Sequence, residues 1–378
     1  MLPLISESDL YISQLALTTL TSMVLSHKAF LPIIPQTILP EALVLMRSPL
    51  LQGTTLNSML DFFKSIVQTS FPGLDCNELV ARLTEPILQP SANSLPLSKQ
   101  AYYSISKCIA AITLLNSKSA LAIVSSLIQQ VRNPSISICS PDSVQLYSLL
   151  TMAEIGKKLD LGQFQEQIEQ AILISFDSTN EDVKSAASVC LGSVSVGNLE
   201  QYLPFVLNGI SLKQKRQYLL LNALKEIISC SSTDINLIKH LEPQLQSIWD
   251  LLIEHSNSDE EGTRYVVAEC LGKLTLLKPS ILPELIKNMH SPSPYVRDTI
   301  ITSIRFTILD TPHEIDILHR NYISQVLATL KDSDINVRRV ALITFNSAAH
   351  NKPSLIRDSL SATLQLLYKE TKIKVCYK

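Results

Sequence analysis

The stretch NEDVKSAASVCLGSVSVG, residues 180–197, decides the fold class. It opens with Asn180, whose side chain can accept hydrogen bonds from the free amides at the start of a helix. Apolar residues then recur at helical spacing, at Val183, Ala187, Cys190, Leu191 and Val194. Because that spacing gathers apolar side chains on one side, the stretch predicts a helix with a single buried stripe.

The start of this stretch recurs along the chain as a capping residue, two variable positions, a β-branched residue, a polar residue and a further apolar residue. Clear copies are DLYISQLA from Asp9, NEDVKSAA from Asn180, SPYVRDTI from Ser293 and DINVRRVA from Asp334. Weaker copies are PDSVQLYSLL from Pro141 and EGTRYVV, which follows the phrase start at Glu260. From position 141 onward the copies start 39, 80, 33 and 41 residues apart, and 80 equals two repeats of 40. These periods are typical of HEAT and armadillo repeats.

The second helix of each predicted pair has proline in or near its first turn, followed by an apolar run. The instances are LPIIP from Leu31, LPEAL from Leu39, LPFVL from Leu203 and ILPELI from Ile281. Proline in a first turn costs no intrahelical hydrogen bond. Since one helix pair cannot cover its own apolar face, the pairs must stack. The sequence therefore predicts an all-α, HEAT/ARM-type solenoid superhelix of stacked antiparallel helix pairs, with residues 1–378 in one continuous array of about nine pairs.

Other segments are assigned from apolar pattern and turn composition. Helices are expected in SPLLQGTTLNSMLDFF from Ser48, KQAYYSISKCIAAITLL from Lys99 and KRQYLLLNALKEIIS from Lys215. Loops are expected at Gln89–Gln100 and Asn133–Ser143, which are rich in Ser, Pro and Asn.

Composition narrows the possible partners. The formal net charge is -2, which provides no general attraction for nucleic acid or for an anionic membrane. The seven cysteines contain no CxxC pair and are expected to be reduced thiols. No signal peptide or membrane-spanning run is evident, so a soluble protein of the nucleus and cytoplasm is expected.

The sequence carries none of the common catalytic or ligand-binding motifs. Gly192 to Gly197 has P-loop spacing, but Asn198 and Leu199 follow where a phosphate-binding loop needs Lys and Ser or Thr. The sequence contains no HExxH, GxSxG, GxGxxG or EF-hand loop. His313 and His319, the closest histidine pair, lack the spacing and the neighbours of a metal site. We therefore expect no enzyme, no cofactor and no metal, although an active site built from separated residues stays an alternative.

Basic residues occupy a fixed place in the repeated phrase, at Lys184, Arg264, Arg297 and Arg338. A positive ladder for an acidic partner is one interpretation. Ion pairs within the array, to Asp182, Glu261 or Asp334 of the same or the next repeat, are the favoured interpretation.

Two polar clusters at predicted turns are the candidate partner-binding residues. The first is Lys213, Lys215 and Arg216, and the second is His350, Asn351 and Lys352 before Pro353. Solvated turns are the favoured alternative at both places. If the first cluster binds a partner, charge reversal there should weaken binding without unfolding the chain, because turn residues add little to core packing.

Six runs resemble one known family. They are RSPLLQG from Arg47, KQAYYSISKCIAA from Lys99, EDVKSAASVCLGSVSVGNLEQYLPFVL from Glu181, KRQYLLLNALKEIIS from Lys215, EEGTRYVVAECLGKLTLL from Glu260 and NVRRVALITFNSAAHNKPSLIRD from Asn336. In family order and over nearly the whole chain, they resemble the cullin-associated, neddylation-dissociated family, also described as TATA-binding-protein interactors.

The resemblance implies a HEAT superhelix that wraps a cullin-RING ligase core while the cullin is not neddylated. It also implies competition with the substrate adaptor, and hence a role in SCF complex assembly and protein ubiquitination through mutually exclusive binding. The expected partners are the cullin with its RING subunit and, by the same resemblance, TATA-binding protein. Direct nucleic acid, membrane and small-molecule partners are not expected.

The resemblance also implies an internal-to-C-terminal segment, truncated at both ends relative to the family. The chain is expected to lack the N-terminal repeats around the RING end, and it ends in KIKVCYK where the family continues to a hairpin at the adaptor site. A karyopherin-type or other HEAT-repeat adaptor is the alternative function.

Overall fold

A computed structural model of the chain describes residues 4–26, 32–69, 73–90, 96–134, 140–212, 216–232, 235–309 and 314–357, with a few single positions up to 368. The chain divides into two compact units, residues 1–203 and 204–378. The boundary falls inside helix α10 (Leu199–Ser211). We describe each unit separately, and the continuous array of about nine pairs stays a prediction.

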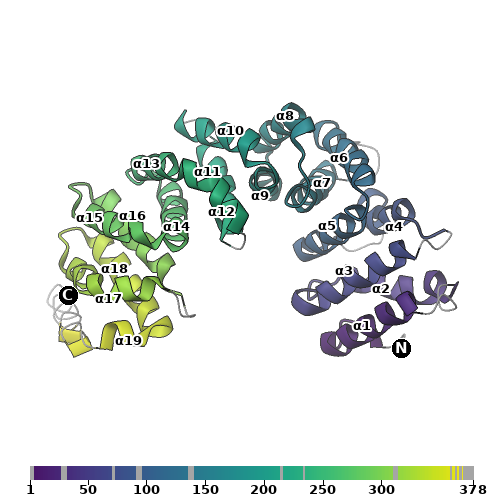
Figure 1. Cartoon of the computed structure of the whole chain (residues 1–378), viewed down its shortest axis with the longest axis horizontal. Coiled ribbons are helices and arrows are strands. Elements are labelled where there is room, and N and C mark those ends of the chain that lie inside the picture. The colour runs from purple at the N-terminus through teal and green to yellow at the C-terminus, as the bar shows by residue number, and fades with distance from the viewer. Residues whose placement is uncertain are drawn as a thin grey trace. The chain divides into compact units, whose positions relative to one another are not determined.

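The first unit consists of helices joined by short turns (Figure 1). Its α-helices are α1 (Leu10–Ser26), α2 (Leu39–Met46), α3 (Gly53–Gln68), α4 (Cys76–Leu88), α5 (Lys99–Thr113), α6 (Ser117–Arg132), α7 (Pro141–Gly156), α8 (Gln165–Phe176) and α9 (Glu181–Gly197). A π-helix at Ile34–Ile38 leads into α2, and a 3-10 turn at Gly162–Phe164 leads into α8.

The second unit continues in the same style. Its α-helices are α11 (Gln217–Ser231), α12 (Ile235–Leu241), α13 (Leu245–His255), α14 (Glu261–Leu277), α15 (Leu282–Lys287), α16 (Pro294–Thr307), α17 (Ile315–Ala328), α18 (Ile335–Asn351) and α19 (Pro353–Ile356). Short 3-10 turns lie at Glu242–Gln244, Pro279–Ile281, Asn288–His290 and Thr329–Lys331.

The helices stack in two layers within each unit. In the first unit, α1, α3, α5, α7 and α9 pack on one another in chain order, and their partners α4, α6 and α8 pack beside them. In the second unit, α11, α14, α16 and α18 form the equivalent row, and α13, α17 and α19 pack against it. Since no strand occurs among the described residues, the all-α HEAT/ARM-type class of stacked antiparallel helix pairs is confirmed.

The predicted apolar stripe forms the core of the first unit. Val183, Ala187, Cys190, Leu191 and Val194 of α9 are all fully buried. α9 and α7 approach so closely that a Cβ added at Gly197 would collide with the carbonyl oxygen of Gly156. Small residues therefore set the spacing of this helix pair.

Three of the four predicted caps are present. Asp9 accepts from the amide of Ile12, Asn180 from that of Asp182, and Asp334 from those of Asn336 and Val337. Ser293 makes no capping bond, because its hydroxyl donates to Oδ1 of Asn257 instead.

Two predicted helix starts are wrong. Pro204 lies in the interior of α10, because the Asn198 side chain accepts a hydrogen bond from the amide of Gln201 and starts the helix earlier. Residues 48–52 are not helical, and α3 begins at Gly53 with a positive φ of 59°, a conformation that glycine adopts at little cost.

The other assignments from pattern agree with the structure in part. α5 begins at Lys99 as expected, and α11 begins at Gln217, within the helix expected from Lys215. The two expected loops follow α4, which ends at Leu88, and α6, which ends at Arg132, but their last residues are helical, because α5 begins at Lys99 and α7 at Pro141. Residues 91–95, 135–139 and 213–215 lie outside the described residues. Leu31 of the first proline motif lies outside the described residues. Among the described residues, no helix is both long enough and apolar enough to cross a membrane.

Candidate protein-binding surfaces

Three arginines of the repeated phrase hold the turn that precedes their own helix. Nη1 of each donates to two backbone carbonyl oxygens five and six residues earlier, at 2.8–3.1 Å. The arginines and their acceptors are Arg264 with Ser258 and Asp259, Arg297 with Ser291 and Pro292, and Arg338 with Asp332 and Ser333. We call this arrangement the carbonyl clamp.

Two of these arginines also reach the next repeat. Arg297 binds both carboxylate oxygens of Asp332, at 2.8 and 2.9 Å, and this hydrogen bonding holds the pKa of Asp332 below its ordinary value. Arg264 lies 3.8 Å from Asp298, but burial outweighs this charge and raises the pKa of Asp298. The phrase arginines are therefore engaged within the fold.

The ion-pair interpretation is thus confirmed for Lys184, Arg264 and Arg297, but these three residues pair with acids other than the ones named from the sequence. Lys184 pairs with Glu181 rather than Asp182, which pairs with Lys99. Glu261 pairs with Arg339 and Asp334 caps α18. Helical side chains lean toward the N-terminus, so each arginine reaches the preceding turn and the neighbouring helix before an acid of its own first turn.

The described residues include only one member of the first candidate cluster. Lys213 and Lys215 lie outside the described residues, while Arg216 is half-buried directly before α11. Partner binding at this cluster stays a prediction.

The second candidate cluster ends α18 and has mixed surroundings. His350 and Asn351 are exposed, and Asn351 Nδ2 donates to the carbonyl of Ile308 at 3.4 Å. Lys352 is buried and its Nζ lies 2.6 Å from a carboxylate oxygen of Asp316, which ties α17 to the end of α18. Partner binding here also stays a prediction, and the exposed side chains are those of His350 and Asn351.

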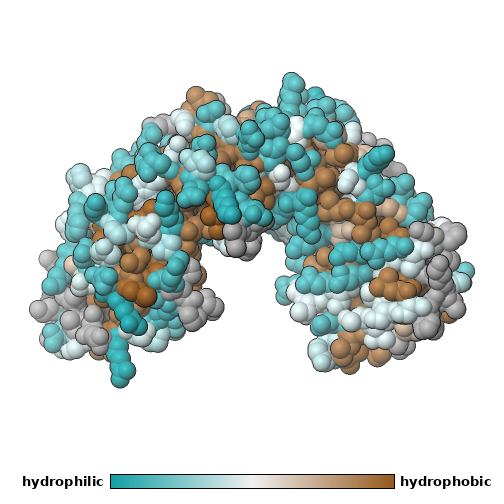
Figure 2. All heavy atoms as spheres, in the orientation of Figure 1, coloured by the Kyte–Doolittle hydropathy of each residue, from teal (hydrophilic) through white to brown (hydrophobic). Residues whose placement is uncertain are grey.

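Exposed apolar residues lie in separate patches between hydrophilic ones on the visible face of each unit (Figure 2). Large aromatic side chains are also exposed on the second unit: Tyr218, Tyr265 and Tyr295 are 42%, 48% and 41% exposed. These tyrosines come from α11, α14 and α16, which are consecutive in the row. Together with Arg305 and Arg339 we call them the tyrosine-arginine face.

Aromatic and guanidinium groups preorganise the tyrosine-arginine face. Arg305 donates to the Tyr265 hydroxyl at 3.2 Å and lies over the rings of Tyr265 and Phe306, at 5.7 and 5.0 Å from their centres. Arg264 lies 4.5 Å above the Tyr295 ring. Tyrosine and arginine are enriched at the centres of protein interfaces, since they present large, ordered contact area.

The sequence patterns did not predict the tyrosine-arginine face, although two of its tyrosines lie in copies of the repeated phrase. Tyr265 stands in EGTRYVV and Tyr295 in SPYVRDTI, both used only for their capping pattern. A large aromatic side chain at a solvent-facing position of the repeat would have been the signal.

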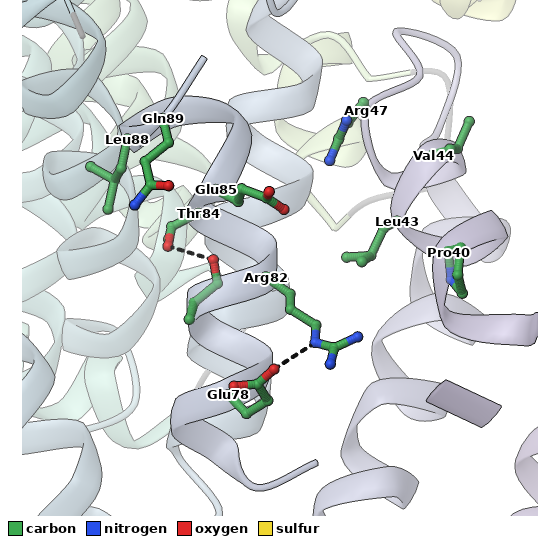
Figure 3. Close-up of a pocket in the computed structure, with 11 residues that line it drawn as sticks. Pro40, Leu43, Val44, Arg47, Glu78, Arg82, Thr84, Glu85, Leu88 and Gln89 are labelled. Carbon is green, nitrogen blue, oxygen red and sulfur yellow. Dashed lines mark hydrogen bonds and ion pairs between the residues drawn. The ribbon is translucent and has the colours of Figure 1, made fainter. Parts of the chain in front are cut away.

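A groove of about 700 Å³ separates α2 from α4 in the first unit (Figure 3). Leu43 and Arg47 point from α2 toward α4, and Arg82 and Glu85 point from α4 toward α2. Arg82 pairs with Glu78 of its own helix at 2.8 Å. We call this feature the α2–α4 groove.

Buried titratable groups are distributed through the core instead of gathering in a pocket. Burial raises the pKa of Cys190 and of Cys270 to about 12, and it also raises the pKa values of Tyr147 and Tyr202. Within the described residues, no group of three or more His, Cys, Asp and Glu side chains is placed to hold a metal ion.

The chain was compared with known proteins. It matches no family model. It is 43% identical over 385 residues to cullin-associated NEDD8-dissociated protein 1 of Drosophila melanogaster, an alignment that covers 98% of this chain and 30% of the relative. The chain belongs to the cullin-associated NEDD8-dissociated family.

Other members of the cullin-associated NEDD8-dissociated family show similar likeness. Protein 2 of Rattus norvegicus is 39% identical over 98% of the chain, and protein 1 of Dictyostelium discoideum is 40% identical over 99%. The chain spans about 30% of the length of these relatives. A solved structure of Kap95p with RanGDP covers 93% of the chain and 46% of its own, at 12% identity and a TM-score of 0.46, which is too low to bear on function.

Proposed function

We propose that the chain is a non-catalytic scaffold segment that binds a cullin-RING ligase core when the cullin is not neddylated. The observation that supports it is the 43% identity to a cullin-associated NEDD8-dissociated protein over nearly the whole chain. A karyopherin-type adaptor is not favoured, since the sequence likeness over nearly the whole chain is to cullin-associated NEDD8-dissociated proteins.

The proposed mechanism is competition without bond chemistry. A stacked helical row offers an extended contact surface, and a cullin bound to it would exclude a substrate adaptor that needs overlapping space. Binding of the two partners is then coupled negatively, and each lowers the affinity for the other by the same factor. The proposal extends to the RING subunit and TATA-binding protein as partners, and to the nucleus and cytoplasm as locations.

The tyrosine-arginine face is the contact surface that we assign to this function. It is exposed, and its cation–π and hydrogen-bond contacts fix the side chains before a partner arrives, which reduces the entropy lost on binding. The carbonyl clamps of Arg264 and Arg297 hold the turns that precede α14 and α16, the helices to which Tyr265 and Tyr295 belong.

The test is a titration of the chain against a purified cullin-RING core, with and without neddylation and with and without a substrate adaptor. Selective binding to the unmodified core, reduced by the adaptor, is the expected result. Equal binding to both cores, or no binding by the folded chain, would refute the proposal.

The contact surface needs a separate test. Tyr265→Ala with Arg305→Ala should weaken core binding by at least about tenfold, the effect of losing a hot spot of about 1.4 kcal/mol. Lys64→Ala, a change at a partly exposed residue of α3 in the first unit, serves as the control. Unchanged affinity in the folded double variant would remove this face from the proposal.

A further inference from the structure

The α2–α4 groove exists because two neighbouring helices share a support without covering each other. α2 and α4 both rest on α5, but contact between α2 and α4 themselves is marginal at most. By contrast, the equivalent helices α6 and α8 pack on each other. The first unit thus presents an open channel between two helical walls.

The length of the channel is that of a short helix. Its lining runs from Pro40 to Arg47 on α2 and from Glu78 to Gln89 on α4. At 1.5 Å per residue the longer wall extends about 16 Å, the length of about three helical turns. The groove volume of about 700 Å³ accommodates one face of such a helix, with the opposite face left in solvent.

The walls offer apolar surface to an occupant. Val44 is 64% exposed, a high value for a β-branched residue next to a groove, and Leu43 is half-buried beside it. Ala81 of α4 adds a small apolar surface, and Leu88 lines one end. The Thr84 hydroxyl is already used by the carbonyl of Val80, at 2.9 Å.

The charges of the walls are complementary in sign across the channel. Arg82 and Glu78 neutralise each other on α4. Arg47 on α2 and Glu85 on α4 have no side-chain partner among the described residues, and in Figure 3 both are directed into the space between the helices. An occupant that brings an acid to the first wall and a base to the second would pair both.

The walls also decide the conformation of the occupant. Both walls are α-helices and neither is a strand, so an extended peptide would find no strand edge to extend. A helical segment satisfies its own backbone groups, so it needs no backbone hydrogen bonds from the walls. The balanced wall charges also disfavour nucleic acid, which requires a basic surface.

We propose that the α2–α4 groove binds one amphipathic helix of a partner protein, about three turns long. Its apolar stripe covers Val44, Leu43 and Ala81, an acidic flank faces Arg47, and a basic flank faces Glu85. The proposal does not rest on cullin binding, because the groove and its charges belong to the first unit alone.

The probe is a displayed library of helical peptides about three turns long, with an apolar stripe and randomised flanks. The wild-type chain should enrich helices with an acid on one flank and a base on the other. Arg47→Glu combined with Glu85→Arg should enrich the reverse arrangement. A peptide enriched on the wild type should bind it at least about fivefold more tightly than it binds this double variant, and the charge-reversed peptide should show the opposite preference. This is the factor expected from an ion pair of about 1 kcal/mol.

Two matched controls separate groove binding from general stickiness. Val44→Asp should abolish the enrichment, whereas Lys64→Glu, a charge reversal at a partly exposed residue of α3, should leave it unchanged. Circular dichroism verifies that each variant is folded. Failure to enrich the predicted charge arrangement, or equal binding of enriched helices to wild type and Val44→Asp, would overturn the proposal. Cullin-core affinity of Val44→Asp, measured in parallel, reports on the proposed function independently.

Discussion

Gly272 of α14 has no side chain where two helices of the second unit meet. A Cβ added there would lie 2.5 Å from the Cβ of Phe306 and 2.7 Å from the carbonyl oxygen of Ser303. Gly272→Ala should therefore push α16 away from α14 and lower the free energy of unfolding by about 1–3 kcal/mol, as overpacked substitutions do. Urea unfolding followed by far-UV circular dichroism measures the change.

The same helix provides the control. A Cβ added at Gly262 meets nothing closer than a Tyr218 ring carbon at 3.8 Å. Gly262→Ala should leave stability unchanged or raise it by up to about 1 kcal/mol, since alanine favours helix over glycine. Equal urea midpoints for the two variants would show that the contact at Gly272 does not limit the spacing.

Asp332 makes the stability of the helical row in the second unit depend on pH. Because Arg297 lowers its pKa, the ionised carboxylate stabilises the fold above its ordinary pKa of 3.8, and this contribution disappears as the pH falls through the lowered value. Asp332→Asn should thus cost about 1–3 kcal/mol near pH 7 and progressively less in acid. Urea unfolding of both proteins at several pH values tests this, with the exposed Asp61→Asn as control. A difference that does not change with pH would contradict it.

At the scale of the element, helix starts depend on single side chains. Asp334 accepts from two amides at the start of α18, whereas Ser293 accepts from none at the start of α16. Asp334→Ala should cost about 1 kcal/mol, and Ser293→Ala should stay within about 0.5 kcal/mol. Thermal unfolding measures the stability that each variant loses. A larger loss for Ser293→Ala than for Asp334→Ala would contradict the assignment of Asp334 as the capping residue of greater effect.

The elements also show what a sequence can predict. Caps and apolar spacing are local, so the starts of α9 and α18 and the buried stripe of α9 could be predicted from residues 180–197 and 334–341. The partner of Arg297 could not, because Asp332 is brought to it by the packing of the next helix. The α2–α4 groove depends on how far apart two helices rest on a third, a distance that no residue pattern encodes.

At the scale of the whole molecule, each of the two compact units contains a buried cysteine whose reactivity reports on unfolding of that unit. Cys190 lies in the first and Cys270 in the second, both fully buried, and burial raises the pKa of each to about 12. Both thiols should resist a thiol reagent near pH 8 in the native protein, where the half-buried Cys76 reacts sooner. Peptide-resolved mass spectrometry of labelling measures each one.

The same reporters test whether the units unfold independently. If they do, Gly272→Ala should lower the urea concentration that exposes Cys270 more than the one that exposes Cys190. Equal shifts at both thiols would show that residues 1–203 and 204–378 unfold as one cooperative body.

The carbonyl clamps of the second unit have a mechanical consequence. Guanidinium groups stay protonated, so the hydrogen bonds of the carbonyl clamp within each repeat persist in acid. The Arg–Asp pairs between repeats depend instead on carboxylates that titrate. Asp298, with its raised pKa, becomes neutral before Asp332, whose pKa is lowered. On acidification the contact between α14 and α16 through Arg264 and Asp298 therefore loses its charge attraction before the contact between α16 and α18 through Arg297 and Asp332 does, so the repeats are released one after another and not all at once.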